Sequence, residues 1–399
     1  MSKKWDRRDF LKRGMATAST AVLANSYSND TQANQVESSD LRLRDKFFGC
    51  IAGSHIASAM GAAVEGWSWD RIEKKYGTLD RLLSYEHYGN GWKREPGTTE
   101  DGIERQKLMI AAILEKQGRV TAEDVRKAWV DHMNPNAPRL VSEPFEGELL
   151  AMAKTHMPAA DIGKYTDYSG LVSLSRSCHP IGLINAGDIE GAIHDIRDVG
   201  QLYHTANSRG IQWAEVTVVG IASAAKPDAT VDSVLASILD NGGNVDKRFT
   251  RDAGVRQELE RGLKLTENCQ EFREMREKFD DVYSGHGITY AHSFANEIVT
   301  KAVCIFRMTR GNTWEAMKAA VNMGRDTDCL AAVASGISGA LTGAESIPEK
   351  MINQVDYATS INPYTNSRRT IKETSDLLFD AYVARLRRMK AFIDGMNVL

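Results

Sequence analysis

Small residues recur at every fourth position in two stretches of this chain, and that spacing constrains the fold more than any other feature. The positions are Gly49, Gly53, Ala57 and Gly61 in the first stretch, and Ala332, Gly336 and Ala340 in the second. A repeat of four residues marks one face of an α-helix. Side chains this small let a neighbouring backbone approach closely. The sequence therefore predicts two tightly packed helices, and one arrangement is that the two stripes face each other.

The first of these stretches, residues 41–65, is apolar enough to raise the question of a membrane span. Small residues four apart would mediate helix dimerisation in a bilayer. However, Lys46, Ser54, His55 and Ser58 interrupt the apolar run. We therefore expect a core helix of a water-soluble domain and no stable membrane insertion. Glu65 ends the stripe just before Gly66 and could either lie on the surface or point into a cleft.

Two acidic turns each stand at the start of an expected helix. One contains Thr99, Glu100 and Asp101, and the other contains Asp326 and Asp328. Taken singly, each turn can be explained as a helix N-cap with solvated acids. If the two turns meet, however, four carboxylates share one cleft, which is costly without a cation. Carboxylate, hydroxyl and carbonyl oxygens are the ligands that magnesium, manganese and calcium prefer.

The remaining sequence predicts a single large all-α domain. Helical patterns follow one another along the chain, alternation typical of strands is scarce, and no repeat of fixed period is present. The 399 residues are 42% hydrophobic and 26% charged, which is ordinary for a globular protein. A formal charge of −3 gives no indication of nucleic-acid binding. Five cysteines without a CxxC pair argue against a disulfide framework or a zinc ribbon.

The N-terminus resembles a twin-arginine export signal. Arg7 and Arg8 precede Phe10, Leu11 and a short, weakly apolar run. We expect a signal peptide over residues 1–24, a flexible polar leader over 25–40 and the all-α domain over 41–399. The resemblance implies recognition by the twin-arginine translocase and a periplasmic or secreted location. The alternative is the basic N-terminal tail of a cytoplasmic protein.

The order and spacing of the motifs resemble those of the ADP-ribosylglycohydrolase family over roughly residues 44–350. The matching stretches are Gly61 to Glu65, Thr99 to Gly102 (Thr-Asp-Asp-Thr in the family), Ser169-Gly170 with Arg176 to Gly182, Tyr203-His204, and Gly324 to Cys329 (Gly-Gly-Asp-Thr-Asp-Thr in the family). Each motif is weak by itself, and the specificity comes from their combination.

The resemblance implies a metal-dependent glycoside hydrolase with an all-α fold. Its substrate would be an ADP-ribosyl or related small-molecule glycoside or glycoconjugate, cleaved at the anomeric carbon through an N- or O-glycosidic bond. Two magnesium ions are implied, with manganese or calcium as alternatives. The implied metal ligands are Thr99, Glu100, Asp101, Asp326, Asp328 and Cys329. The implied catalytic residues are Glu65, Glu100 and Asp101, and the implied substrate-binding residues are Gly170, Ser177, His179 and His204.

Three departures from the family pattern bear on this expectation. Glu100 is one methylene longer than aspartate, Gly102 lacks a hydroxyl group, and Cys329 offers a soft thiol that suits magnesium poorly. One metal site is therefore expected to be weakened or filled by a different ion. Export is a further departure, since ADP-ribosylated proteins are chiefly intracellular, and another glycoside is an alternative substrate.

Several alternatives remain open on the sequence. The domain could be a non-catalytic binding or structural protein on the same fold, which Gly102 and Cys329 favour. Glu65 could support other residues at the helix end, and His204 could be a hydrogen-bonded core histidine. Cys329 as a nucleophile is disfavoured, because nearby carboxylates would oppose formation of a thiolate.

Overall fold

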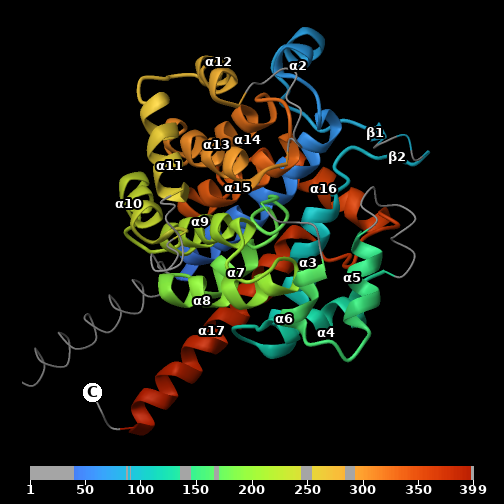
Figure 1. Cartoon of the computed structure of the whole chain (residues 1–399), viewed down its shortest axis with the longest axis vertical. Coiled ribbons are helices and arrows are strands. Elements are labelled where there is room, and N and C mark those ends of the chain that lie inside the picture. Colours follow the sequence, from blue (N-terminus) through green and yellow to red (C-terminus); the bar gives the residue numbers. More distant parts are fainter. Residues whose placement is uncertain are drawn as a thin grey trace, which may run out of the picture. The chain divides into compact units, whose positions relative to one another are not determined.

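The computed structural model describes residues 40–86, 89, 91–134, 145–165, 170–243, 254–283 and 293–396. The expected signal peptide and nearly all of the expected leader lie outside these residues. The chain divides into two units, and the fold below is that of the larger unit, Arg44–Leu399. Within the described residues, the strands form a single two-stranded antiparallel sheet, β1 (Tyr85–Glu86) with β2 (Lys93–Arg94). The expected all-α class is confirmed (Figure 1).

The helices follow one another along the chain. The first helix covers residues 40–61 and continues as η1 (Ala62–Val64). The next are α2 (Trp69–Tyr76), α3 (Asp101–Lys116), α4 (Ala122–His132), α5 (Phe145–Ala153), α6 (Ala159–Ile162), η3 (Gly163–Tyr165), α7 (His179–Ile184), α8 (Ile189–Val199), η4 (Gly200–Leu202), α9 (Arg209–Ala224) and α10 (Val231–Asn241). The last are α11 (Gly254–Leu265), α12 (Phe272–Tyr283), α13 (Ala295–Met308), α14 (Thr313–Val321), α15 (Thr327–Thr342), α16 (Glu349–Ile361) and α17 (Ile371–Met396).

Helix α15 forms the centre of the core. Every residue from Thr327 to Ala340 is buried, and the helix packs against α9, α13 and α14 (Figure 1). Asp326 caps its N-terminus, and Gly343 ends it with a φ of 73° that suits glycine. Because a helix buried on all sides needs small and apolar side chains, the composition of this stretch fits its position.

The first helix packs against α15 at close backbone distance, as its glycine spacing predicts. A Cβ atom added to Gly53 would lie 2.5 Å from the Ser335 carbonyl oxygen, and one added to Gly339 would lie 2.1 Å from the Gly49 carbonyl oxygen. The contact face on α15 therefore includes Ser335 and Gly339. Gly336 faces His179 instead. We had considered the stripe of Ala332, Gly336 and Ala340 for this contact, but the neighbouring stripe, one residue earlier along the helix, makes it.

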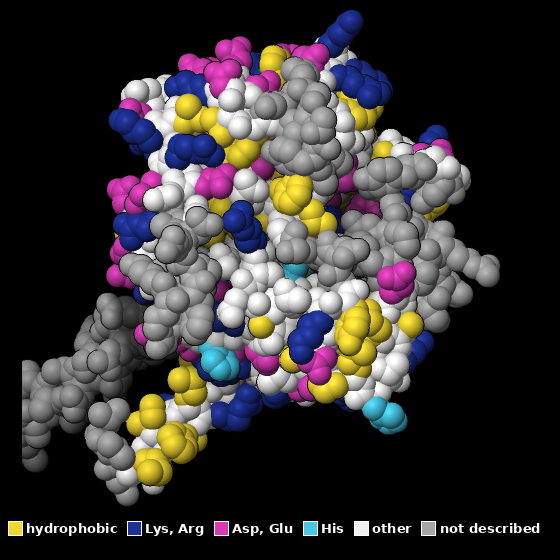
Figure 2. All heavy atoms as spheres, in the orientation of Figure 1, with side chains coloured by type: hydrophobic (Ala, Val, Ile, Leu, Met, Phe, Trp, Pro, Cys, Tyr) yellow, Lys and Arg dark blue, Asp and Glu magenta, His cyan; other side chains and the backbone are white. Residues whose placement is uncertain are grey.

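Residues Asp40–Val64 form a helix that is long and apolar enough to cross a membrane. However, 89% of its most apolar window is buried inside the protein, as expected for a core helix. Exposed apolar side chains gather at the C-terminal end of α17, where Phe392 and Met396 are more than half exposed (Figure 2).

Candidate metal centre

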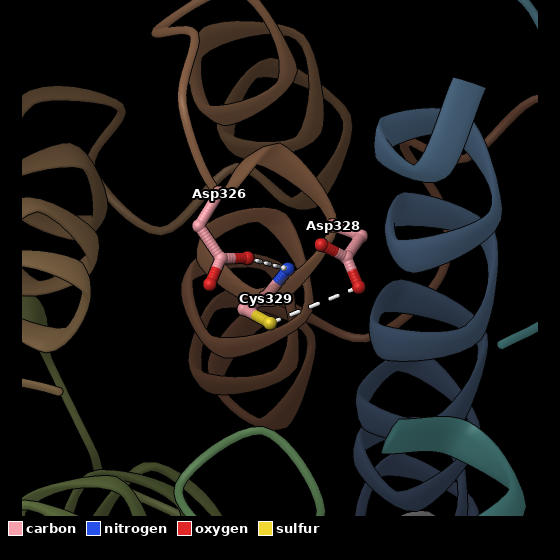
Figure 3. A group of neighbouring side chains, drawn as sticks. All are labelled: Asp326, Asp328 and Cys329. Atoms are coloured by element: carbon pink, nitrogen blue, oxygen red, sulfur yellow. Dashed lines mark hydrogen bonds between the residues drawn. The ribbon is translucent and has the colours of Figure 1, made fainter. Parts of the chain in front are cut away.

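The acidic turn at the start of α15 forms a compact cluster of candidate metal ligands. Ligand atoms of Asp326, Asp328 and Cys329 all lie within 4.8 Å of one another (Figure 3). Asp326 Oδ1 accepts a hydrogen bond from the Cys329 backbone N–H at 3.3 Å. Oδ2 of Asp326 and Oδ1 of Asp328 are buried and have no hydrogen-bond partner among the described residues. Buried carboxylate oxygens without a partner are costly, so these two atoms fit a cation.

The backbone ahead of this turn is clamped to the end of the first helix. Arg325 N–H donates to the Trp67 carbonyl at 2.7 Å, and Gly66 N–H donates to the Arg325 carbonyl at 2.7 Å. The Thr327 hydroxyl donates to the Gly61 carbonyl at 2.8 Å. These bonds hold the turn next to Glu65, whose half-buried side chain lies close enough to influence Asp328 electrostatically.

A second turn with buried acids opens α3. Glu100 is its N-cap residue, and Glu100 Oε1 lies 2.6 Å from both the Tyr85 hydroxyl and Arg94 Nε. The Thr99 hydroxyl donates to Glu104 Oε1 at 3.1 Å. All of these side chains are buried. The carboxylate of Glu100 therefore already has a cationic partner and a neutral donor from the protein itself.

Arg176 joins the two acidic turns. Its Nη2 atom donates to Asp101 Oδ2, while its Nη1 atom lies 3.4 Å from Asp328 Oδ2 and 3.2 Å from the Cys329 sulfur. Asp101 also pairs with Arg105 at 3.1 Å. The turns thus meet as we hypothesised, but guanidinium groups compensate much of their negative charge.

Burial raises the pKa values of Asp328 and Cys329 well above their usual range. For Asp328, the charges of Glu65 and Asp326 add to the effect of burial, and Arg176 opposes it. For Cys329, Arg176 opposes the effect of burial on the thiol pKa without reversing it. A raised thiol pKa disfavours the thiolate, which is the form in which a cysteine acts as a nucleophile.

The cluster suits one divalent cation better than two. Asp326 and Asp328 each offer a buried oxygen without a partner, so they fit a hard cation. Glu100 and Asp101 are paired with Arg94, Arg105 and Arg176, so binding an ion there would have to displace a guanidinium group. The roles of these three arginines were not expected from the sequence. The sequence feature that could have pointed to Arg176 was Gly102, which we interpreted only as the loss of a hydroxyl group.

Two of the expected substrate-binding residues lie in the core. The Ser177 hydroxyl donates to the Ser173 carbonyl at 2.7 Å. His179 Nε2 donates to the Ala332 carbonyl at 2.9 Å, which leaves Nδ1 to accept from Gln106 Nε2 at 3.2 Å. Burial lowers the His179 pKa to about 4, so the ring is neutral. His179 therefore links α3, α7 and α15, and a part for it in substrate binding stays a prediction.

The other two expected substrate-binding residues lie in different surroundings. Gly170 has a φ of 84° and accepts a hydrogen bond from the Ala295 N–H at 2.9 Å. His204 is buried, with Nε2 3.4 Å from the Ser173 hydroxyl and its ring against Gly210. Their part in substrate binding stays a prediction.

Comparison with known proteins gives consistent matches over most of the chain. A family model described as ADP-ribosylglycohydrolase matches residues 39–386. The uncharacterized protein YegU of Escherichia coli (strain K12) is 24% identical over 350 residues, covering 82% of this chain and 99% of that protein. A solved structure described as "ADP-ribosylglycohydrolase-related protein complex" has a TM-score of 0.59 and 17% identity, covering 86% of this chain and 99% of that one. At that identity, the structural likeness shows a shared fold.

Proposed function

Because the chain belongs to the ADP-ribosylglycohydrolase family, we propose that it is a divalent-cation-dependent hydrolase that cleaves an ADP-ribosyl or related glycoside at the anomeric carbon. The observation that carries this proposal is the pair of buried, unpartnered oxygens on Asp326 and Asp328. Both oxygens lie at the N-terminal end of α15, where one ligand atom from each of Asp326, Asp328 and Cys329 lies within 4.8 Å of the other two. Magnesium or manganese is the ion that such a set of oxygen ligands suits.

In this proposal Asp326 and Asp328 hold the cation. When bound, the ion supplies positive charge that orients sugar hydroxyls and water. Glu65, half-buried at the end of the first helix, accepts or donates the proton that cleavage of a glycosidic bond requires. Glu100 and Asp101 are held by arginines, so we assign them a role in positioning rather than proton transfer. Cys329 belongs to the same cluster of candidate ligands, whereas the Thr99 hydroxyl donates to Glu104 in the second turn.

Export by the twin-arginine translocase is part of the proposal. It rests on Arg7 and Arg8 and on the short apolar run that follows them. Replacing both arginines by lysine should leave the precursor in the cytoplasm, whereas the unchanged chain should be found, shortened, in the periplasm or medium. Equal localisation of the two proteins would remove this part of the proposal.

A non-catalytic binding protein on the same fold is the second candidate. The observation that favours it is the arginine partnering of Glu100 and Asp101, because these charges are stabilised without any ion. Such a protein would bind a ligand and release no product.

Release of free ADP-ribose or free sugar from a panel of glycosides tests the proposal. Product should form with added magnesium or manganese, stop with EDTA and return when the metal is restored. Asp328→Ala should abolish turnover. Asp195→Asn is a matched control, because Asp195 is a buried aspartate paired with Arg119 elsewhere in the fold. Turnover that survives both EDTA and Asp328→Ala would contradict the proposal, and ligand binding without turnover would favour the second candidate.

A further inference from the structure

Arg176 occupies a central position between the two acidic turns. Its guanidinium group reaches Asp101 on α3 and both Asp328 and Cys329 on α15. The side chain is buried, with 8% of its surface exposed. A buried positive charge between two carboxylates from different helices fills the place where a bridging metal ion could bind.

Gly102 on α3 has no side chain and so leaves room for the stem of Arg176. A Cβ atom at Gly102 would lie 2.8 Å from Arg176 Cδ and 3.0 Å from Arg176 Nε. Any larger side chain at position 102 would therefore compete with the arginine stem. Glycine is also unfavourable inside a helix by about 1 kcal/mol relative to alanine, so its presence needs a local reason, and the stem of Arg176 provides one.

The side chains around the guanidinium group accept hydrogen bonds from it. The Cys329 thiol is a poor ligand for a hard cation but accepts a weak hydrogen bond from Arg176 Nη1 at 3.2 Å. The backbone of Arg176 is fixed as well, because its carbonyl accepts from Gln106 Nε2 at 2.9 Å. Position 176 is thus held by α3 at both its backbone and its side chain.

The two carboxylate oxygens without a hydrogen-bond partner are different atoms from the one that faces Arg176. Asp326 Oδ2 and Asp328 Oδ1 are buried without a hydrogen-bond partner among the described residues, whereas Asp328 Oδ2 faces Arg176. A divalent ion bound on the Asp101 side would be repelled by the guanidinium group and would have to displace it.

We propose that the Arg176 guanidinium replaces one of the two cations of this centre, so that the protein binds a single divalent ion at Asp326 and Asp328. This inference rests on the proposed function, since it assumes that the cluster binds a cation at all. It assigns Arg176 as a positioning residue that takes over the charge of the second ion and links Asp101 to Asp328.

Manganese binding to the purified protein tests the inference without reference to activity. We would load metal-free protein with Mn²⁺, measure its stoichiometry by elemental analysis after dialysis, and record electron paramagnetic resonance spectra. The unchanged protein should bind one ion per chain and show the six-line spectrum of an isolated Mn²⁺. Arg176→Gln should bind two ions and show the broadened spectrum of a coupled pair.

Two controls separate charge from fold. Arg176→Lys keeps a positive charge at this position and should still bind one ion. Arg385→Gln removes a buried arginine that pairs with Asp188 away from the cluster, and it should also leave the stoichiometry at one. Circular dichroism checks that each variant is folded. If Arg176→Gln does not fold, the spectrum of the unchanged protein still decides between one ion and a coupled pair.

The outcomes distinguish this inference from the proposed function. Two ions in the unchanged protein would overturn the inference and leave the proposed function standing. One ion in both the unchanged protein and Arg176→Gln would show that Arg176 does not exclude the second ion. No bound ion in either protein would overturn the cation centre itself, and the inference with it.

Discussion

Arg325 donates two hydrogen bonds to the Glu297 carboxylate, of 2.7 and 2.8 Å, and its own backbone has a φ of 67°. A positive φ is unfavourable for a residue with a side chain. The bidentate ion pair, buried beside α13, offsets that cost and orients the turn that leads into Asp326. The geometry of the candidate metal centre thus depends on a contact that lies outside it.

Replacing Arg325 by alanine should lower the free energy of unfolding by about 3 kcal/mol, because the buried Glu297 carboxylate would lose both hydrogen bonds from this guanidinium group. Arg325→Gly should be less harmful by about 1 kcal/mol, since glycine accepts a positive φ. Urea unfolding of the two variants measures both values. Equal stability of the variants would show that the backbone conformation contributes nothing.

Glycine contacts between the first helix and α15 should tolerate no side chain. Gly339→Ala would place a methyl group 2.1 Å from the Gly49 carbonyl oxygen, so we expect a loss of about 3 kcal/mol from forced backbone separation. Gly395→Ala is the matched control, because nothing lies within 4 Å of a Cβ there and alanine favours the helix. Thermal unfolding should show a marked decrease for the first variant and none for the second.

The contribution of Glu146 to the free energy of unfolding should fall as the pH rises from about 4.5 to about 7. Burial raises its pKa to about 7, with Asp101 adding to the effect and Arg105 and the Tyr364 hydroxyl opposing it. Since the unfolded pKa is lower, folding favours the protonated form, and this contribution disappears as the pH passes the folded pKa. It amounts to about 3 kcal/mol at most.

Glu146→Gln tests this prediction, since glutamine keeps an acceptor for Arg105 and does not titrate. Between about pH 4.5 and 7, the free energy of unfolding of the variant should therefore fall less with rising pH than that of the unchanged protein. His179 contributes with the opposite sign, since its lowered pKa makes stability fall at acid pH, and it is common to both proteins. Parallel curves for the variant and the unchanged protein would contradict the assignment.

Removing the metal should destabilise the protein, and Asp328 should mediate the effect. An ion at 100 times its dissociation constant stabilises the folded state by about 2.7 kcal/mol. Asp328→Asn should abolish this gain while leaving the metal-free protein as stable as before or more so, because it removes a buried acid whose pKa is strongly raised. Scanning calorimetry with manganese and with EDTA measures both. A metal-induced shift that persists in the variant would place the ion elsewhere.

The sequence alone was sufficient for the features that depend on near neighbours. The four-residue spacing of Gly49, Gly53 and Gly61 predicted a closely packed helix, and that helix lies against α15. The two acidic turns were recognised as helix starts, and the structure places the N-caps at Glu100 and Asp326. These features follow from local periodicity and capping, which a few consecutive residues determine.

Only the tertiary structure decided which side chains meet. Arg176 and Asp328 are 152 positions apart, and nothing in their local sequences shows that they pair. His179 matched a loop expected to contact substrate, yet its ring lies in the core between Gln106 and Ala332. Likewise, Gly102 suggested a missing hydroxyl group until the stem of Arg176 was found beside it. A motif specifies residue types along the chain, whereas the direction of each side chain and the charge opposite it depend on helix packing across long sequence separations.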